Sequence, residues 1–170
     1  MIRSEMNQPE IIAYRSGDQA EVEAFFANVW RRARFPFDPE AAHSDLRRIP
    51  AAYQSNGGGF WLMRDPEIIG TVAVRRLPEN VAEVKRLNVA EFHRGRGLGR
   101  QLLRHAVVHA KDAGFRCVRL DTIRNEGPAI HLFRNFGFLE ISRYNDNADA
   151  NLFMELDLRK AESAASLNEA

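Results

Sequence analysis

A glycine-rich turn between an apolar segment and a strongly periodic helix constrains the fold of this chain most. The turn follows an apolar segment that ends at Val89, and its residues are Arg94, Gly95, Arg96, Gly97, Leu98, Gly99 and Arg100. Glycine allows a tight turn, and the first N–H groups of the following helix have no intrahelical partner. These donors, the helix dipole and the arginines predict a cradle for a phosphate group. The alternative is an arginine-rich turn before an ordinary helix.

The glycine spacing excludes two common phosphate-binding motifs. A dinucleotide fingerprint needs a glycine at its sixth position, which here is Arg100 counted from Gly95 and Leu102 counted from Gly97. A Walker A loop needs Gly-Lys-Ser/Thr, which the sequence lacks. The remaining pattern, Arg-x-x-Gly-x-Gly at residues 94–99, closely resembles that of the GNAT superfamily of acyl-CoA-dependent N-acetyltransferases. In that family the motif holds the pyrophosphate of coenzyme A.

The order of the expected elements is also that of the GNAT fold. Hydrophobic periodicity and turn residues predict strands at 11–15, 60–63, 68–74, 81–89, 117–122, 138–144 and 152–158, and helices at 18–34, 39–54, 98–113 and 128–136. Pro50 weakens the prediction of the second helix, and a split of this helix at Pro50 is the alternative. The resemblance implies an α+β (α/β) fold with a mixed, mostly antiparallel sheet of about seven strands and about four helices. We expect a single domain over 1–170, with a core at about 11–158 and a flexible tail at 159–170.

The strand at 81–89 changes its alternation in the middle. Ala82 and Val84 share one face, whereas Leu87 and Val89 share the other. One extra residue near Lys85 or Arg86, a β-bulge, would bring all four onto one face and leave backbone groups unpaired. The resemblance also implies a bulge here, next to the acyl thioester.

The resemblance assigns several residues to acetyl-CoA. Backbone groups of Leu87, Asn88 and Val89 would pair with the pantetheine arm, and those of residues 96–100 would hold the pyrophosphate. Asn125 matches an asparagine that contacts pantetheine, although it can equally be a helix N-cap or a loop residue.

Phe133 is also assigned to the cofactor site, and its position departs from the family pattern. Many members have a tyrosine there that protonates the leaving thiolate, and phenylalanine cannot donate a proton. Either another group does so, Tyr144 being the nearest candidate, or the thiolate leaves unprotonated, which a thiol pKa of about 8.5 tolerates.

Glu83 is the candidate general base, acting directly or through water, because it lies beside the expected bulge and several relatives carry a carboxylate there. The alternative is a solvated or salt-bridged strand residue. Asp121 is the second acidic candidate.

Arg34 and Phe35 are the candidate acceptor-binding residues. They lie in a segment, 30–37, that places three arginines among aromatic residues. Guanidinium groups bind carboxylates and phosphates bidentately, so an acceptor with an acidic group beside its amine would suit them. The alternative is that these arginines solvate the end of a helix.

Composition limits the partners and the location. The formal net charge of +1 gives no overall attraction to nucleic acid or to an anionic membrane. The single Cys117 excludes an internal disulfide, and the five histidines show no metal-ligand spacing, so we expect no metal. We find no apolar signal segment and expect a cytoplasmic protein, with a homodimer left open.

Two functions follow from this reading. The first is an acetyl-CoA-dependent N-acetyltransferase that acts on a primary amine of a small molecule or peptide by direct attack in a ternary complex. The second is a binding module. It is either a non-catalytic acyl-CoA-sensing or binding module of the same fold, which the missing tyrosine at Phe133 keeps open, or a basic-helix nucleic-acid binder, which the near-neutral net charge weakens.

Overall fold

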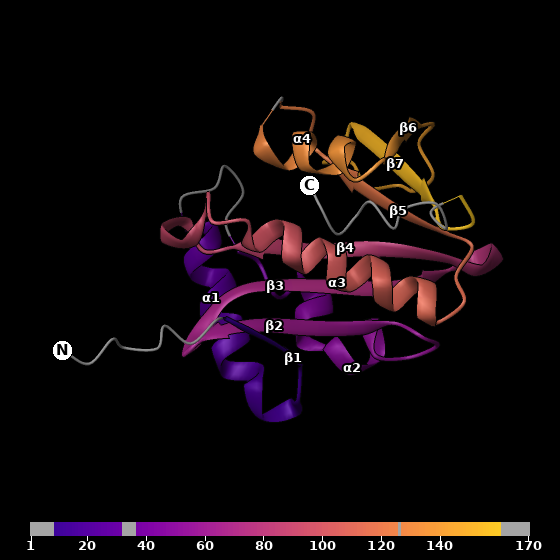
Figure 1. Ribbon diagram of the computed structural model, residues 1–170. Coiled ribbons are helices and arrows are strands. Elements are labelled where there is room, and N and C mark those ends of the chain that lie inside the picture. The colour runs from indigo at the N-terminus through magenta and orange to yellow at the C-terminus, as the bar shows by residue number, and fades with distance from the viewer. Residues whose placement is uncertain (1–8, 32–36, 126, 161–170) are drawn as a thin grey trace.

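The computed structural model describes residues 9–31, 37–125 and 127–160. Within them, seven strands form one sheet in the order β1-β2-β3-β4-β5-β7-β6 (Figure 1). The strands are β1 (Glu10–Ala13), β2 (Gly59–Asp65), β3 (Glu67–Leu77), β4 (Val81–Val89), β5 (Cys117–Thr122), β6 (Leu139–Ile141) and β7 (Leu152–Asp157). Neighbouring strands are antiparallel, except that β4 and β5 run parallel. This confirms the predicted mixed, mostly antiparallel α+β sheet.

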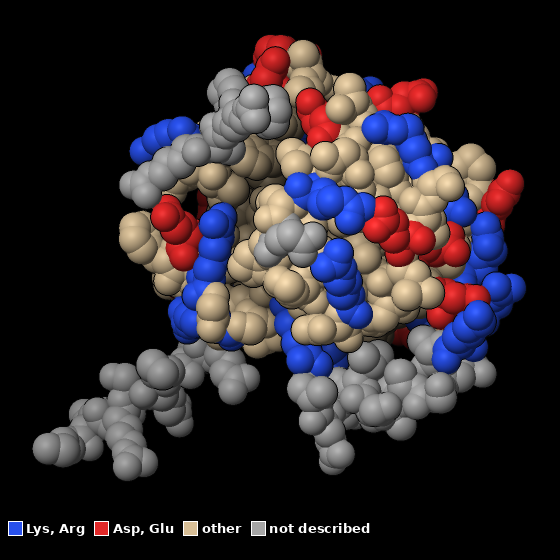
Figure 2. Space-filling view, turned by 90° about the horizontal axis from the view of Figure 1, so that it is seen from above, with Lys and Arg blue, Asp and Glu red and all other residues tan. Residues whose placement is uncertain are grey.

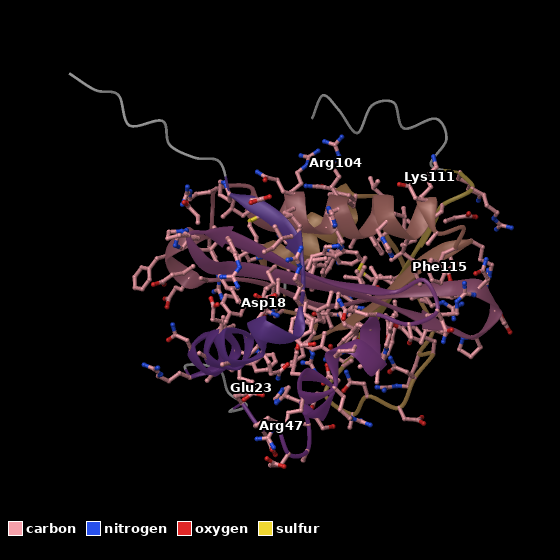
Figure 3. All side chains as sticks on the ribbon, turned by 90° about the horizontal axis from the view of Figure 1, so that it is seen from below. Asp18, Glu23, Arg47, Arg104, Lys111 and Phe115 are labelled. Carbon is pink, nitrogen blue, oxygen red and sulfur yellow. The ribbon has the colours of Figure 1, made fainter. Side chains whose placement is uncertain are left out.

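Helices cover both faces of the sheet. Helices α1 (Gln19–Trp30) and α2 (Ile49–Tyr53) pack on one face, and α3 (Leu98–Asp112) and α4 (Pro128–Asn135) on the other. Figure 3 shows α3, with Arg104 and Lys111, on the opposite side of the sheet from α1, with Glu23. The sheet therefore separates two hydrophobic cores.

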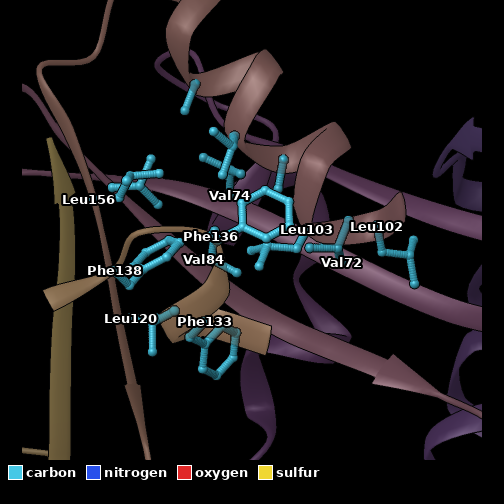
Figure 4. Packing of buried hydrophobic residues seen from close by; sticks show 14 of the residues in the cluster. Val72, Val74, Val84, Leu102, Leu103, Leu120, Phe133, Phe136, Phe138 and Leu156 are labelled. Carbon is cyan, nitrogen blue, oxygen red and sulfur yellow. The ribbon is translucent and has the colours of Figure 1, made fainter. Parts of the chain in front are cut away.

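Helix α3 carries the larger core. The six residues predicted to form its apolar stripe are all buried, namely Leu98, Leu102, Leu103, Ala106, Val107 and Ala110. Figure 4 shows Leu102 and Leu103 packed with Val72, Val84 and Phe133 in this core. The C-terminal end of the helix is capped by Gly114, whose positive φ of 79° lets the N–H of Phe115 donate to the carbonyl of Ala110 (3.0 Å).

The bulge expected in β4 is present. Thr71 of β3 pairs with Asn88 and Ala73 pairs with Lys85, so Arg86 and Leu87 together face a single residue of β3. Arg86 has a left-handed φ of 55°. As a result Leu87 and Val89 pack against the same core as Ala82 and Val84, as the alternation predicted.

Three predicted elements differ from the structure. The helix expected at 39–54 is wrong: turns are followed by a 3-10 helix (Ser44–Arg47) and the one-and-a-half-turn α2. Pro50 lies in the first turn of α2, where its missing N–H costs nothing, and so it starts a helix rather than continuing one. The first helix is shorter than predicted, ending at Trp30, and the strand expected at 138–144 contains only β6.

Candidate active site

The parallel strands β4 and β5 separate part of the way along the sheet. They pair only from Val81 to Glu83 on β4, opposite Cys117 to Arg119 on β5, and then diverge, as Figure 1 shows. A cavity of about 790 Å³, here called the split hollow, lies where they part. The second half of β4, the turn at 93–100, the end of β5 and the start of α4 line it. Beyond Glu83, β4 has no β5 partner in the described sheet, so the edge of β4 that faces away from β3 borders this hollow.

Most of the residues assigned to the cofactor come together here. Those that line the split hollow are Leu87, Asn88, Val89, Arg94, Gly95, Gly97, Leu98, Gly99, Arg100 and Phe133. Gly95 and Gly97 both have a φ of +75°, a conformation that favours glycine. The N–H of Gln101 donates to the carbonyl of Gly97 (3.1 Å), so the preceding N–H groups lie before the first helical hydrogen bond. The turn therefore presents backbone donors at the positive end of α3.

Two assigned residues lie outside the lining of the split hollow. Arg96 is exposed, with Nη1 3.1 Å from Nδ1 of His93. Asn125 is also exposed, and its Oδ1 accepts a hydrogen bond of 3.0 Å from the N–H of Gly127, the N-cap of α4. Asn125 therefore makes a hydrogen bond within the loop before α4, and a loop residue was one of the alternatives that the sequence left open.

A second hollow, of about 580 Å³ and here called the polar hollow, opens on the α1 and α2 face of the sheet. Its lining includes His43, Asp45, Tyr53, Arg75 and Asn145. The two hollows meet at five shared residues, which are Lys85, Arg86, Asp121, Asn147 and Asp149. A ligand in the split hollow and a second ligand in the polar hollow would therefore meet beside the bulge.

His43 presents a neutral imidazole to the polar hollow. Burial lowers the pKa of His43 below its ordinary 6.5, and the nearby Arg86 lowers it further. Its Nδ1 lies 2.9 Å from the N–H of Asp38 and accepts from it, which assigns the ring proton to Nε2.

Glu83 and Tyr144, the two catalytic candidates, are hydrogen-bonded to each other. Glu83 is fully buried, and its Oε1 accepts from the hydroxyl of Tyr144 (2.8 Å) and from Nδ2 of Asn145 (3.3 Å). Its Oε2 forms an ion pair of 2.5 Å with Nε of Arg75, its direct partner across β3 and β4. Burial and the charge of Glu83 raise the pKa of Tyr144, which therefore stays protonated at neutral pH. Neither residue lines a hollow, and Arg75 and Asn145 lie between Glu83 and the polar hollow.

Asp121 is part of the same polar network and lines both hollows. Its Oδ1 pairs with Nζ of Lys85 (2.7 Å), and its Oδ2 accepts from the amides of Asn145 (2.8 Å) and Asn147 (3.0 Å). Burial alone would raise the pKa of Asp121, but Lys85 and these amides outweigh it and lower the pKa. Asp121 is thus held as a carboxylate, and the pair with Lys85 spans the gap between β4 and β5 where their pairing has ended.

Several lining residues were not predicted. The split hollow is also lined by Thr122, Ile123, Pro128, Ala129, Leu132, Asn147 and Asp149, and the polar hollow by His43, Ser44, Asp45 and Arg48. The run of Asn and Asp at 145–149 between two strands was a usable signal for a functional loop. Arg34 and Phe35, the predicted acceptor residues, fall outside the described residues.

Among the described residues, no group of three or more His, Cys, Asp or Glu side chains is arranged to hold a metal ion. In the same residues, no helix has the length and apolar character needed to cross a membrane.

Comparisons with known proteins agree with this geometry. The model of a family described as "Acetyltransferase (GNAT) family" matches residues 22–138. N-acetyltransferase 8B of Rattus norvegicus is 31% identical over 109 residues, covering 60% of this chain and 49% of that protein. A GNAT-family acetyltransferase structure from Staphylococcus aureus Mu50 has a TM-score of 0.79 at 25% identity, covering 88% of this chain and 99% of that one. The Salmonella typhimurium protein yncA, solved with its cofactor acetyl-CoA, has a TM-score of 0.69 at 18% identity, covering 89% and 95%.

The chain spans about half the length of the curated relatives that it matches first.

Proposed function

Because the chain belongs to the GNAT acetyltransferase family, we propose that it is an acetyl-CoA-dependent N-acetyltransferase acting on a primary amine of a small molecule or peptide. The observation that carries this proposal is the separation of β4 from β5 beyond Glu83, which opens the split hollow beside an edge of β4 that has no strand partner there. The solved relative that contains acetyl-CoA supports the choice of cofactor.

The residues around the split hollow fit acetyl-CoA. The backbone of Leu87, Asn88 and Val89 would hold the pantetheine arm, as an added strand is held at a sheet edge. The N–H groups of residues 96–100, with Arg94 and Arg100, would hold the pyrophosphate at the start of α3. A Cβ added at Gly95 or Gly97 would meet no atom within 4 Å, so the turn leaves open space on its outer side for a bulky anion. When bound, acetyl-CoA supplies an acetyl group that is already activated as a thioester.

The polar hollow is the proposed entry for the acceptor amine. It meets the split hollow at the bulge, and direct attack needs both substrates held together at such a junction. Its charged and amide side chains suit a polar acceptor. Arg34 and Phe35 stay predictions for the acceptor site, because no described contact involves them.

Glu83 is the proposed general base, acting through water because Arg75 and Asn145 lie between its carboxylate and the polar hollow. Tyr144 is the proposed proton donor to the leaving thiolate. The hydrogen bond between them supports this division, since a proton taken from the amine by Glu83 can replace the one that Tyr144 gives up. Neither residue lines the split hollow, so a water molecule would complete the path to the sulfur.

A thiol-release assay with acetyl-CoA and a panel of amines tests the proposal directly. Cys117 is the only cysteine and is 2% exposed, and burial raises its pKa to about 11, so the protein contributes little background to a disulfide reagent. We expect release of coenzyme A that depends on the amine. Tight acetyl-CoA binding in calorimetry without turnover on any amine would instead favour the sensing module, the alternative that Phe133 supports by lacking a hydroxyl.

Nucleic-acid binding has no comparable support. Figure 2 shows a face on which Lys and Arg form separate groups among uncharged residues, with Asp and Glu beside several of them.

A further inference from the structure

Arg86 has a backbone conformation that its residue type disfavours. It lies in the bulge of β4 with a φ of 55°, in the left-handed region where a side chain crowds the following carbonyl. Such a conformation persists only where surrounding contacts hold it. The next two residues, Leu87 and Asn88, line the split hollow. The contacts that hold Arg86 therefore also set the geometry of this lining.

The guanidinium of Arg86 is held by Asp45, far away in sequence. Nε and Nη2 of Arg86 contact Oδ2 and Oδ1 of Asp45 at 2.9 Å and 2.5 Å. The hydroxyl of Tyr53 also donates to Oδ2 of Asp45, and the guanidinium lies 5.4 Å from the ring of Trp30. The side chains of Arg86 and Asp45 are only 15% and 20% exposed. This is a two-point contact in a fixed geometry, which a lysine could not reproduce.

The backbone carbonyl of Arg86 is held separately from its side chain, by a residue of β3. Thr71 on β3 is fully buried, and its hydroxyl donates a hydrogen bond of 2.7 Å to this carbonyl. The bulge removes Arg86 from the regular ladder between β3 and β4, so the threonine supplies the partner that the ladder does not. Both the side chain and the carbonyl of Arg86 are thus anchored.

We propose that Arg86 is a positioning residue that, through Asp45 and Thr71, holds the bulge in the shape that aligns the thioester with the acceptor. This proposal rests on the proposed acetyltransferase function. Arg86 lines both hollows, and Asp45 lines the polar hollow, so the ion pair joins the acceptor side to the cofactor side. Arg86 acts through backbone geometry and makes no required contact with either substrate.

Comparing glycine and alanine at position 86 isolates this role. Both substitutions remove the guanidinium, but glycine adopts a φ of 55° without strain and alanine does not. Arg86→Ala should lower kcat by about 10- to 100-fold with little change in the KM for acetyl-CoA, because the misalignment occurs at the reacting centre. Arg86→Gly should keep a kcat at least about fivefold above that of Arg86→Ala. Asp45→Asn, which keeps the shape of the partner, should lower kcat in the same direction.

Arg64→Ala is the matched control. Arg64 lies on β2, is 20% exposed and pairs with both Asp18 and Glu21, but it lines neither hollow. Its loss should leave kcat within about twofold of the parent. A similar fall in kcat for Arg64→Ala would overturn the proposal, because any lost ion pair would then suffice.

A second readout needs no turnover. In ¹H–¹⁵N spectra of the protein without cofactor, the amides of Leu87 and Asn88 should move in Arg86→Ala, stay near their parent positions in Arg86→Gly, and be unchanged in Arg64→Ala. Equal losses of kcat in the glycine and alanine variants, with unmoved amides in both, would show that the guanidinium acts on a substrate and would overturn the positioning role. If the parent has no turnover, the proposed function fails, and the amide shifts alone decide whether Arg86 holds the bulge.

Discussion

The hydroxyl of Tyr144 donates a hydrogen bond of 2.8 Å to Oε1 of Glu83, across 61 positions of sequence. Glu83 lies on β4, and Tyr144 lies in the loop that joins β6 to β7. The sheet order brings them together, because β7 pairs with β5 and the loop returns over the first part of β4. The contact links the proposed base to the proposed acid.

Removing either partner should slow turnover and spare cofactor binding. Glu83→Gln should lower kcat by about 100-fold or more, since a general base contributes that much, and Tyr144→Phe should also lower it. The double variant should lose less than the product of the two effects, because the two groups act in one path. Steady-state kinetics measure the loss of turnover, and calorimetry measures acetyl-CoA binding.

Glu155→Gln controls for loss of a strand carboxylate, since Glu155 pairs with Arg119 (2.8 Å) and lines neither hollow. Unchanged turnover and an unchanged pH profile in Glu83→Gln would leave Glu83 a structural residue and direct attention to Asp121.

Local patterns in the sequence predicted the bulge and the glycine-rich turn. The alternation of apolar residues along this strand changes between Val84 and Leu87. This change located the bulge, because the alternation shows which face of the strand is buried. The apolar stripe of α3 and the glycines at 95 and 97 are also signals contained in a short window of sequence. In the structure the stripe is buried, and both glycines have a positive φ.

The segment at 39–54 shows where such patterns fail. Leu46, Ile49 and Tyr53 are all buried, as predicted, yet they do not lie on one helix. Leu46 lies in the 3-10 helix, and Ile49 and Tyr53 lie in α2. Asp45, next to Leu46, is held by Arg86, 41 residues away. The hollow that this segment lines depends on that distant contact. The split between β4 and β5 is likewise a long-range property that no window of sequence contains.

The turn at Gly97 provides a test of the cofactor cradle. Gly97→Glu should abolish most of the acetyl-CoA affinity, because a carboxylate side chain would occupy the space proposed for the pyrophosphate and repel it. Gly114, at the other end of the same helix, has a similar φ of +79° against +75°, and an added Cβ meets nothing within 4 Å at either position. Both glutamate variants should therefore lose about 1–2 kcal/mol of stability from the left-handed backbone.

Calorimetry measures the affinity for acetyl-CoA, and urea denaturation measures the free energy of unfolding. Together they separate the effect on binding from the effect on stability. The cradle assignment is wrong if Gly97→Glu binds acetyl-CoA as tightly as Gly114→Glu does.

Asp121 should contribute stability that depends on pH. Its pKa is lowered below the ordinary 3.8, so its stabilising effect is complete above that value and is lost as the pH falls through the lowered pKa. Asp121→Asn should cost about 2–3 kcal/mol at pH 7, since Lys85 loses its partner at a nearly buried site, and less under acid conditions. Urea denaturation across this pH range measures the difference.

Asp112→Asn, at an exposed position on α3, controls for the loss of a surface carboxylate. A cost for Asp121→Asn that stays constant down to acid pH would contradict the role of its charge.

Phe133 offers a gain-of-function test of thiolate protonation. It is 6% exposed, lines the split hollow and packs against Phe138, with ring centroids 6.0 Å apart. Phe133→Tyr would place a phenol, with an ordinary pKa of about 10, on the wall of the split hollow. If protonation of the thiolate limits turnover, kcat should rise severalfold while the KM for acetyl-CoA changes little. Phe136→Tyr, at the C-cap of the same helix but outside the lining of both hollows, should bury a hydroxyl and lower stability without raising kcat. The sharpest comparison uses the Tyr144→Phe background, in which Phe133→Tyr should restore much of the lost rate. No recovery there, with acetyl-CoA still bound, would mean that the thiolate leaves unprotonated and that Tyr144 acts only by orienting Glu83.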